Sequence, residues 1–423
     1  MFKQPFRRFS IVFILILITY RILLDIMYHY IIAPVYPEYK VNIIDFIRLF
    51  ESYMLTLVII PFLKIDFRKP SEFYIFILLT AVFFPMCSIY SFTGASRLYI
   101  YTVFLSILVL ISITKLPRVA VISLKEGRVL GIVLCVVGVS LALAWLLSHG
   151  AANYFNLNVK EIYKFRSAVS THIYRGLWSY LISWAGKVFN PALIAWFLFK
   201  KRWDCVAFFV VVQVSFFGLT SHKLYCAIGI GVLILYLLSF TKRPGLIIIT
   251  CLLGSMVVAA GLFFVFNDAW TLAIVVQRPL FKPALLNFTY QEFFESRELV
   301  LLSNGIFGKI IEYPFDVAPP YLVGQYLKGD PAPSSNTGFL GTGYMHFGLL
   351  GVIGFSIVVG VLLRIVDSIA HGRCSVWLAN AVVFGSFTSM LTSGDLLASL
   401  NTHGGLWSIT ILWLLCSYRL LKV

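Results

Sequence analysis

Long apolar runs recur along almost the whole chain, and this repetition limits the possible folds more than any other feature. A helix needs about 20 apolar residues to cross the hydrocarbon core of a bilayer. About twelve runs approach that length, namely 9–30, 43–63, 73–91, 98–114, 129–149, 179–199, 205–220, 223–240, 245–266, 337–363, 376–393 and 405–418. Because every backbone polar group in lipid must be satisfied internally, these runs predict an all-α, polytopic transmembrane bundle that forms one domain over residues 1–423.

The composition excludes other broad classes. Apolar residues make up 60% of the chain and charged residues 12%, whereas soluble domains have about 45–50% and about 25%. The formal net charge of +16 would indicate nucleic acid in a soluble protein. Here every second short loop carries the Lys and Arg residues, so the positive-inside rule explains most of the charge. We therefore expect no nucleic-acid partner, and we expect both termini to be cytoplasmic.

Two long polar segments then face outward. The first covers about residues 150–176, and the second, larger one covers about residues 267–335. Apolar residues at helical spacing in the second segment predict an amphipathic helix over 285–302, which we expect to lie at the membrane surface.

Ionisable residues inside the predicted spans form two groups. Arg21 and Asp25 are separated by four residues, and Asp45, Arg48 and Glu51 follow one another at intervals of three. Neighbours at these spacings share one helix face and can neutralise each other. Charges inside a membrane also mark functional sites, so both interpretations stay open.

Cations gather in the segments that should face outward. Arg166 and Arg175 lie in the first long segment, Lys223 lies in a polar turn, and Arg278 lies in the second segment. The positive-inside rule disfavours such residues there, so an anionic ligand is one explanation. Contact with anionic lipid headgroups, or a lysine that extends to the interface, are the alternatives.

The chain contains neither a phosphate-binding glycine loop nor a dinucleotide fingerprint, and no His/Cys pattern typical of zinc. Its seven cysteines show no paired spacing. We therefore expect no metal and no cofactor. Cations without metal ligands are suited to stabilising a phosphate through side chains.

Several segments, taken in order, resemble the bacterial O-antigen polymerases, also called oligosaccharide repeat-unit polymerases. The matching stretches are Val159-Lys-Glu-Ile-Tyr-Lys-Phe-Arg166, Ser221-His-Lys223, Arg278-Pro-Leu-Phe-Lys-Pro, Tyr290-Gln-Glu-Phe-Phe294, Asn336-Thr-Gly-Phe and Phe347-Gly-Leu-Leu-Gly351. They cover about residues 155–355, and the pattern of spans extends the likeness over the chain.

The resemblance implies a GT-C-like glycosyltransferase of the bacterial inner membrane, with its site facing the periplasm. The donor would be a growing glycan on undecaprenyl diphosphate, and the acceptor would be one lipid-linked repeat unit. The product would be O antigen or a related surface polysaccharide, with release of undecaprenyl diphosphate. The reaction would be metal-independent. If the acceptor hydroxyl displaces the diphosphate directly, the anomeric centre is inverted, which is a separate prediction. A chain-length-regulating co-polymerase is a further expected partner.

The resemblance and the chemistry together predict the site residues. Arg166, Lys223 and Arg278 are expected to bind the diphosphate, with Arg175 as a further candidate. His346 is the first candidate for the general base and Glu292 is the alternative. Sugar or acceptor contacts are expected from Tyr290, Asn336 and Tyr163.

Other interpretations remain open at this stage. Arg278 would have only a structural role if it formed an ion pair with Glu292 or Glu295. Asn336 would likewise have only a structural role if it capped the following helix. An O-antigen ligase uses the same donor and needs the same residue types. A transporter or flippase of lipid-linked oligosaccharides would also place cations in a cavity, although the sequence shows no internal repeat of the kind common in transporters.

Overall fold

The structure is a computed structural model that describes residues 11–41, 45–158, 161, 165, 173–329 and 334–417. The α-helices are α1 Ile11–Met27, α2 Ala33–Val35, α3 Phe46–Ile59, α4 Pro70–Ile77, α5 Phe84–Phe92, α6 Arg97–Ile113, α7 Gly127–Ser148, α9 Leu177–Trp184, α10 Asn190–Phe199, α11 Trp203–Thr220, α12 Lys223–Leu238, α13 Pro244–Phe266, α14 Ala269–Leu272, α15 Lys282–Glu295, α16 Pro319–Lys328, α17 Phe339–Ala370, α18 Val376–Thr392, α19 Leu396–Leu400 and α20 Gly405–Leu415. Within these ranges the protein is all-helical and contains no strand, as the sequence predicts.

A helix stands at each apolar run that the sequence marks as a span. Among the described residues, seven helical segments are long and apolar enough to cross a membrane, and three further apolar helices are shorter. The longest is α17, and the most buried is the segment Pro70–Phe92, with 89% of its apolar window buried inside the protein. By contrast, Pro244–Phe266 has 17% of its window buried and lies at the periphery beside α1. Helical membrane character is therefore confirmed.

Four prolines inside helical segments give the bundle a local irregularity. Pro34, Pro85, Pro191 and Pro283 each stand at the second residue of a helix that directly follows a π-helical turn. Those turns are Tyr28–Ile32, Leu78–Phe83, Ala185–Phe189 and Ala273–Phe281. Proline lacks an N–H and its ring clashes with the carbonyl four residues earlier. The wider π turn accommodates this conflict while the chain continues as a helix.

Helix α17 is bent sharply rather than straight. Phe347 and Gly348 have non-helical dihedral angles, and the φ of Gly348 is +61°, a region that favours glycine. The glycine-rich start of the apolar run 337–363 predicts that the backbone comes close to a neighbouring backbone. In the structure this close approach occurs between the two halves of α17 itself. A Cβ placed on Gly343 would lie 2.7 Å from the Gly351 carbonyl oxygen. The bend turns residues 339–346 back against the rest of the helix.

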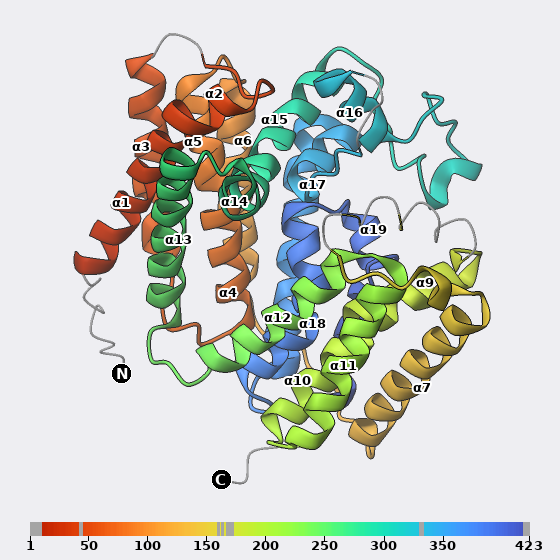
Figure 1. Ribbon diagram of the computed structural model, residues 1–423. Helices are drawn as coiled ribbons and strands as arrows, with labels where there is room; N and C mark the ends of the chain where they lie inside the picture. Colours follow the sequence, from red (N-terminus) through yellow and green to blue (C-terminus); the bar gives the residue numbers. More distant parts are fainter. Residues whose placement is uncertain are drawn as a thin grey trace.

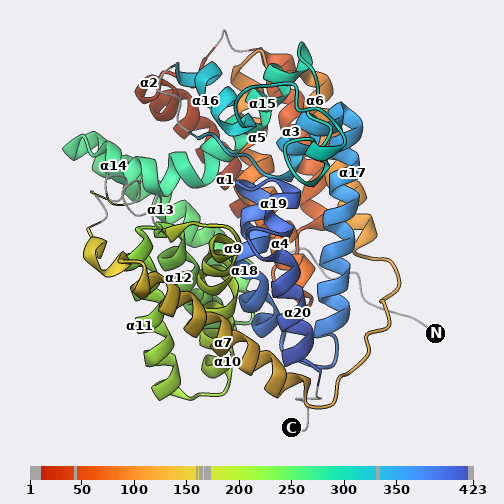
Figure 2. The ribbon, with the colours of Figure 1, turned by 90° about the vertical axis from the view of Figure 1, so that its right-hand side faces the viewer.

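The two ends of the bundle differ in composition. The basic connections around 64–69, 200–202 and 241–243 lie toward the lower end in Figure 1, and the long segment 267–335 lies toward the upper end. Figure 2 shows α14, α15 and α16 gathered at this same end. The loop charges predict that the upper end faces outward.

Helix α15 replaces the amphipathic helix expected over 285–302, and it differs in both extent and environment. It begins at Lys282 and ends at Glu295. Ten of its fourteen residues are buried, so it is packed among α17, α16 and α5 rather than covered on one face only. The sequence pattern found its apolar residues correctly. It missed that Asn287, Thr289 and Gln291 on the polar face would also be buried, because their cover comes from distant segments.

Candidate active site

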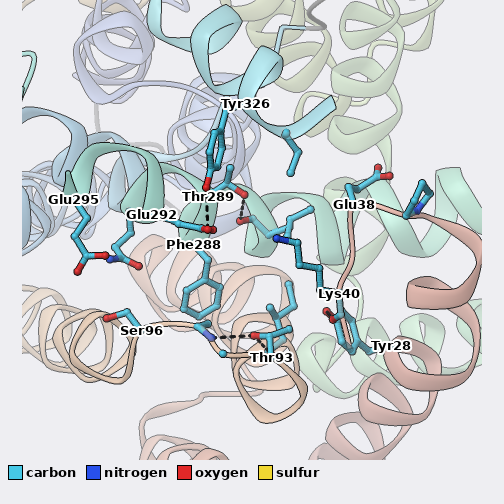
Figure 3. Close-up of a pocket in the computed structure, with 17 residues that line it drawn as sticks. Tyr28, Glu38, Lys40, Thr93, Ser96, Phe288, Thr289, Glu292, Glu295 and Tyr326 are labelled. Carbon is cyan, nitrogen blue, oxygen red and sulfur yellow. Dashed lines mark hydrogen bonds between the residues drawn. The ribbon is translucent and has the colours of Figure 1, made fainter. Parts of the chain in front are cut away.

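A pocket of about 670 Å³ opens at the upper end of the bundle, against α15. Its walls come from the π-helical turn before α2 and the loop after α2, from α5 and the loop that follows it, from one side of α15, and from the end of α16 (Figure 3). The size and the mixture of aromatic and polar side chains are typical of a small-molecule site.

Glutamates dominate the charge of this pocket. Glu38, Glu292 and Glu295 line it together with one lysine, Lys40. Glu292 accepts a hydrogen bond of 2.9 Å from the Tyr326 hydroxyl on α16. Burial of Tyr326, together with the adjacent Glu292, raises the pKa of its phenol, so it stays a hydrogen-bond donor. The structure therefore holds one oxygen of Glu292, and within the described ranges the other oxygen has no hydrogen-bond partner and is available to a ligand.

Ion pairs hold the walls of the pocket in place. Lys328, the last residue of α16, lies 2.7 Å from the carboxylate of Glu38, whose side chain is only 8% exposed. On the opposite side, the guanidinium of Arg48 donates to the backbone oxygens of Thr93 and Ala95 at 3.2 and 2.7 Å. Arg48 also pairs with Asp45 at 3.5 Å, as its spacing predicts. These contacts join α16 and α3 to the loops that line the pocket.

Arg278 lies near this pocket but outside its lining. It is an exposed residue in the π-helical turn Ala273–Phe281, which leads directly into α15. Burial raises the pKa of Tyr36, while the positive charge of Arg278 lowers it and Glu38 raises it further. Arg278 and Glu38 therefore both act on one phenol at the edge of the site. Arg278 is not paired with Glu292 or Glu295 among the described residues, which removes that structural explanation.

The other expected phosphate ligands lie on separate segments. Lys223 is the exposed first residue of α12, and Arg175 is exposed in the turn before α9. Arg166 and the sugar-contact candidate Tyr163 lie outside the described residues. A cluster of four phosphate-binding cations therefore stays a prediction, and of the three members that the structure describes, Arg278 is the one near the pocket.

His346 is held in a way that does not suit a general base. Its Nδ1 accepts the backbone N–H of Leu302 at 3.0 Å, and because a backbone N–H can only donate, Nδ1 carries no proton. Its Nε2 lies 3.3 Å from the Asp395 carboxylate, to which it donates. The residue is 1% exposed and does not line the pocket. With both ring nitrogens engaged, His346 has no free lone pair to receive a proton from an acceptor.

Asp395 makes His346 part of a structural junction. One oxygen of Asp395 accepts the backbone N–H groups of Leu397 and Ala398, which caps α19. Burial tends to raise the pKa of Asp395, but the hydrogen bond from His346 and the two backbone donors outweigh it, so the pKa is lowered. The pair connects the bend of α17 to α19 and to the 299–302 turn. The sequence analysis did not single out Asp395.

Tyr290 and Asn336 come close together but do not reach the pocket. Tyr290 is buried and donates to the backbone oxygen of Ser335 at 3.0 Å. Asn336 is exposed, and its amide donates to Ser334 at 3.1 Å. The N-cap of α17 is Gly338, so capping by Asn336 is ruled out. Tyr290 supports the segment before α17, which gives it a structural task.

Sequence reasoning missed most residues of the pocket other than Glu292. Glu295 is one helical turn beyond Glu292, and this spacing was the one available signal. No sequence pattern near Glu38, Lys40 or Tyr326 marks them as site residues, because they approach α15 only in the folded protein. In the part of the chain that the structure describes, no group of three or more His, Cys, Asp and Glu residues could hold a metal ion.

Comparison with known proteins gives no further information about this site. No protein-family model matches the chain, and neither a curated protein nor a solved structure matches it. The chemistry of the pocket must therefore be inferred from its geometry and from the sequence pattern.

Proposed function

We propose that the protein is an inverting, metal-independent membrane glycosyltransferase that polymerises oligosaccharide repeat units carried on undecaprenyl diphosphate. The observation that carries this proposal is the pocket beside α15, where Glu292 is anchored by Tyr326 at the end of the bundle expected to face outward. The order of the segments that resemble O-antigen polymerases supports it, because Arg278 and Glu292 both belong to those segments.

Glu292 is the better candidate for the general base. A sugar hydroxyl is a weak nucleophile and reacts faster when a positioned base takes its proton. The carboxylate of Glu292 is exposed to the pocket and has one oxygen free, whereas His346 has both nitrogens engaged. We therefore assign the role of general base to Glu292, which the sequence analysis gave as the alternative. We assign a structural role to His346.

The reaction that we propose is a single displacement. The hydroxyl oxygen of the acceptor sugar forms a bond to the anomeric carbon of the donor glycan, and its proton passes to Glu292. The bond between that carbon and the diphosphate oxygen breaks, and the diphosphate leaves with the electron pair. One displacement inverts the configuration, so linkage analysis that shows retention would contradict this mechanism.

Negative charge grows on the diphosphate as its bond to the sugar breaks. A cation at that oxygen stabilises the transition state more than the ground state. Arg278 is suited to this role, because guanidinium binds phosphate with two parallel hydrogen bonds and this residue is exposed beside the 36–40 loop. Lys223, Arg175 and Arg166 are the further candidates.

The test is a lipopolysaccharide gel of a bacterial strain that lacks the gene, with and without complementation. Collapse of the ladder to core plus one repeat unit would support the polymerase. Loss of all O antigen with accumulation of lipid-linked polymer would indicate a ligase instead. Loss of periplasmic lipid-linked units would favour a flippase, and an unchanged ladder would exclude O-antigen assembly and leave capsule polymerisation to be tested.

A further inference from the structure

The charges of the pocket are unevenly matched. The Lys328 ammonium neutralises Glu38 at a distance of 2.7 Å. This pairing leaves two carboxylates, Glu292 and Glu295, and one ammonium, Lys40, as the charges that a ligand would meet. Figure 3 shows these side chains around the pocket. The residues that line the pocket therefore carry an excess of negative charge, while the cations Arg278 and Arg297 lie outside the lining.

Glu292 and Glu295 act from the same wall. They are three residues apart on α15, so both carboxylates lie on one helix face, and both are exposed. Like charges separated by several ångströms at a protein surface repel by roughly 1–3 kcal/mol before screening. A ligand that carries a carboxylate would therefore meet two repulsive groups and one attractive group.

The uncharged part of the lining suits a hydroxyl-rich ring. Thr93 and Ser96 bring hydroxyl groups to the pocket, while Phe288 and Tyr326 bring aromatic rings. Hydroxyl groups and carboxylates exchange hydrogen bonds with sugar hydroxyls, and aromatic rings pack against the C–H faces of a sugar. Neither feature needs a charge on the sugar.

We propose that this pocket selects a terminal acceptor sugar without a carboxylate and disfavours uronic acids, with Glu295 as the specificity-determining residue. This inference rests on the proposed function, because it assigns the pocket to the acceptor. Glu292 receives the proton in that scheme, whereas Glu295 contributes charge only. The Lys40 ammonium attracts a carboxylate and therefore reduces the preference for uncharged sugars over uronic acids.

The test uses the full-length protein in lipid nanodiscs and two probes, methyl glucoside and methyl glucuronoside, which differ only at C6. Saturation-transfer NMR titrations at low salt give a Kd for each probe. We expect the glucoside to bind about tenfold more tightly, and we expect this preference to decrease as salt screens the charges. Glu295→Gln should reduce the preference to about threefold, and Lys40→Gln should increase it.

Glu312→Gln is the matched control, because Glu312 is an exposed carboxylate of the same outer segment that does not line the pocket. It should leave the preference unchanged. Equal binding of both probes, tighter binding of the glucuronoside, or no effect of Glu295→Gln would overturn the inference and leave the proposed function standing. If neither probe bound, the assignment of the pocket to an acceptor sugar would fail as well, while the gel would still test polymerisation.

Discussion

Gly343 and Gly351 face each other across the bend of α17, where a Cβ on Gly343 would lie 2.7 Å from the Gly351 carbonyl oxygen. No real Cβ approaches a backbone atom so closely, and the backbone cannot move away as a flexible side chain would. The bend depends on this contact, and it turns the residues that carry His346 toward Asp395.

Gly343→Ala should therefore disrupt the bend and lower the thermal midpoint in detergent, at a cost of about 1–3 kcal/mol for overpacking. Gly354→Ala is the matched control in the same helix, because a Cβ there meets nothing within 4 Å. Thermal unfolding of both variants checks the prediction. Equal stability of the two variants would show that the contact does not constrain α17.

Glu292→Gln should abolish polymer while expression and thermal stability stay normal. The amide keeps the size of the side chain and can still accept from Tyr326, but it cannot take a proton from a sugar hydroxyl. Loss of a general base typically lowers the rate by about 10²–10⁴-fold. Gel ladders of complemented strains provide the measurement, with Glu312→Gln as the control. A normal ladder in Glu292→Gln would exclude this residue as the base.

His346→Ala should act on stability rather than on chemistry. The change removes the partners of the Leu302 N–H and the Asp395 carboxylate, and each buried group left unsatisfied costs about 1–3 kcal/mol. Polymer formed per molecule of folded protein should stay close to that of the wild type. His371→Ala, at an exposed position near the opposite end, should change neither quantity. A stable but inactive His346→Ala protein would restore His346 to the catalytic machinery.

His403 should make the fold sensitive to acid. Burial and the nearby Lys187 ammonium lower the pKa of His403 to about 3, although Asp395 acts in the opposite direction. An unfolded histidine has a pKa of about 6.5. Between these values the unfolded chain binds a proton that the folded chain does not, so stability is complete above about pH 6.5 and decreases as the pH falls toward 3.

His403→Gln removes this proton and should flatten the loss of thermal midpoint below about pH 6.5, where one group contributes up to about 1.4 kcal/mol per pH unit. The amide can keep a hydrogen bond to Ser389, which lies 2.7 Å from the His403 ring. Thermal scans between pH 4 and 8 compare the variant with the wild type. An unchanged slope would show that other groups cause the acid sensitivity.

Arg21 should be much more important for stability than a surface arginine. It is fully buried, forms an ion pair with Asp25, and donates to Ser88 at 2.8 Å and to Ser52 at 3.0 Å. Arg21→Ala leaves Asp25 as an unpaired buried charge, which costs about 3–5 kcal/mol. Arg202→Ala breaks an exposed pair with Asp204 and should produce no measurable change. Similar thermal midpoints for both variants would contradict this contrast.

The sequence identified the secondary structure well and the site only in part. Helices appear where apolar runs of sufficient length occur, since this signal is local and lipid leaves the backbone few alternatives. The pairs Arg21–Asp25 and Asp45–Arg48 were also predictable, because four or three residues on one helix set their separation. The bend of α17 was harder to predict from the sequence, because many transmembrane helices are rich in glycine and stay straight.

The sequence by itself determined that this chain is a helical membrane protein, because apolar length and loop charge depend on neighbouring residues alone. Only the tertiary structure decided which polar groups meet. Lys328 and Glu38 are far apart in sequence, as are Glu292 and Tyr326, and each pair forms because packed helices bring their ends together. The structure likewise gives the two candidate bases different surroundings. A histidine with both nitrogens bonded and a glutamate with one free oxygen differ in their partners, and partners follow from the fold.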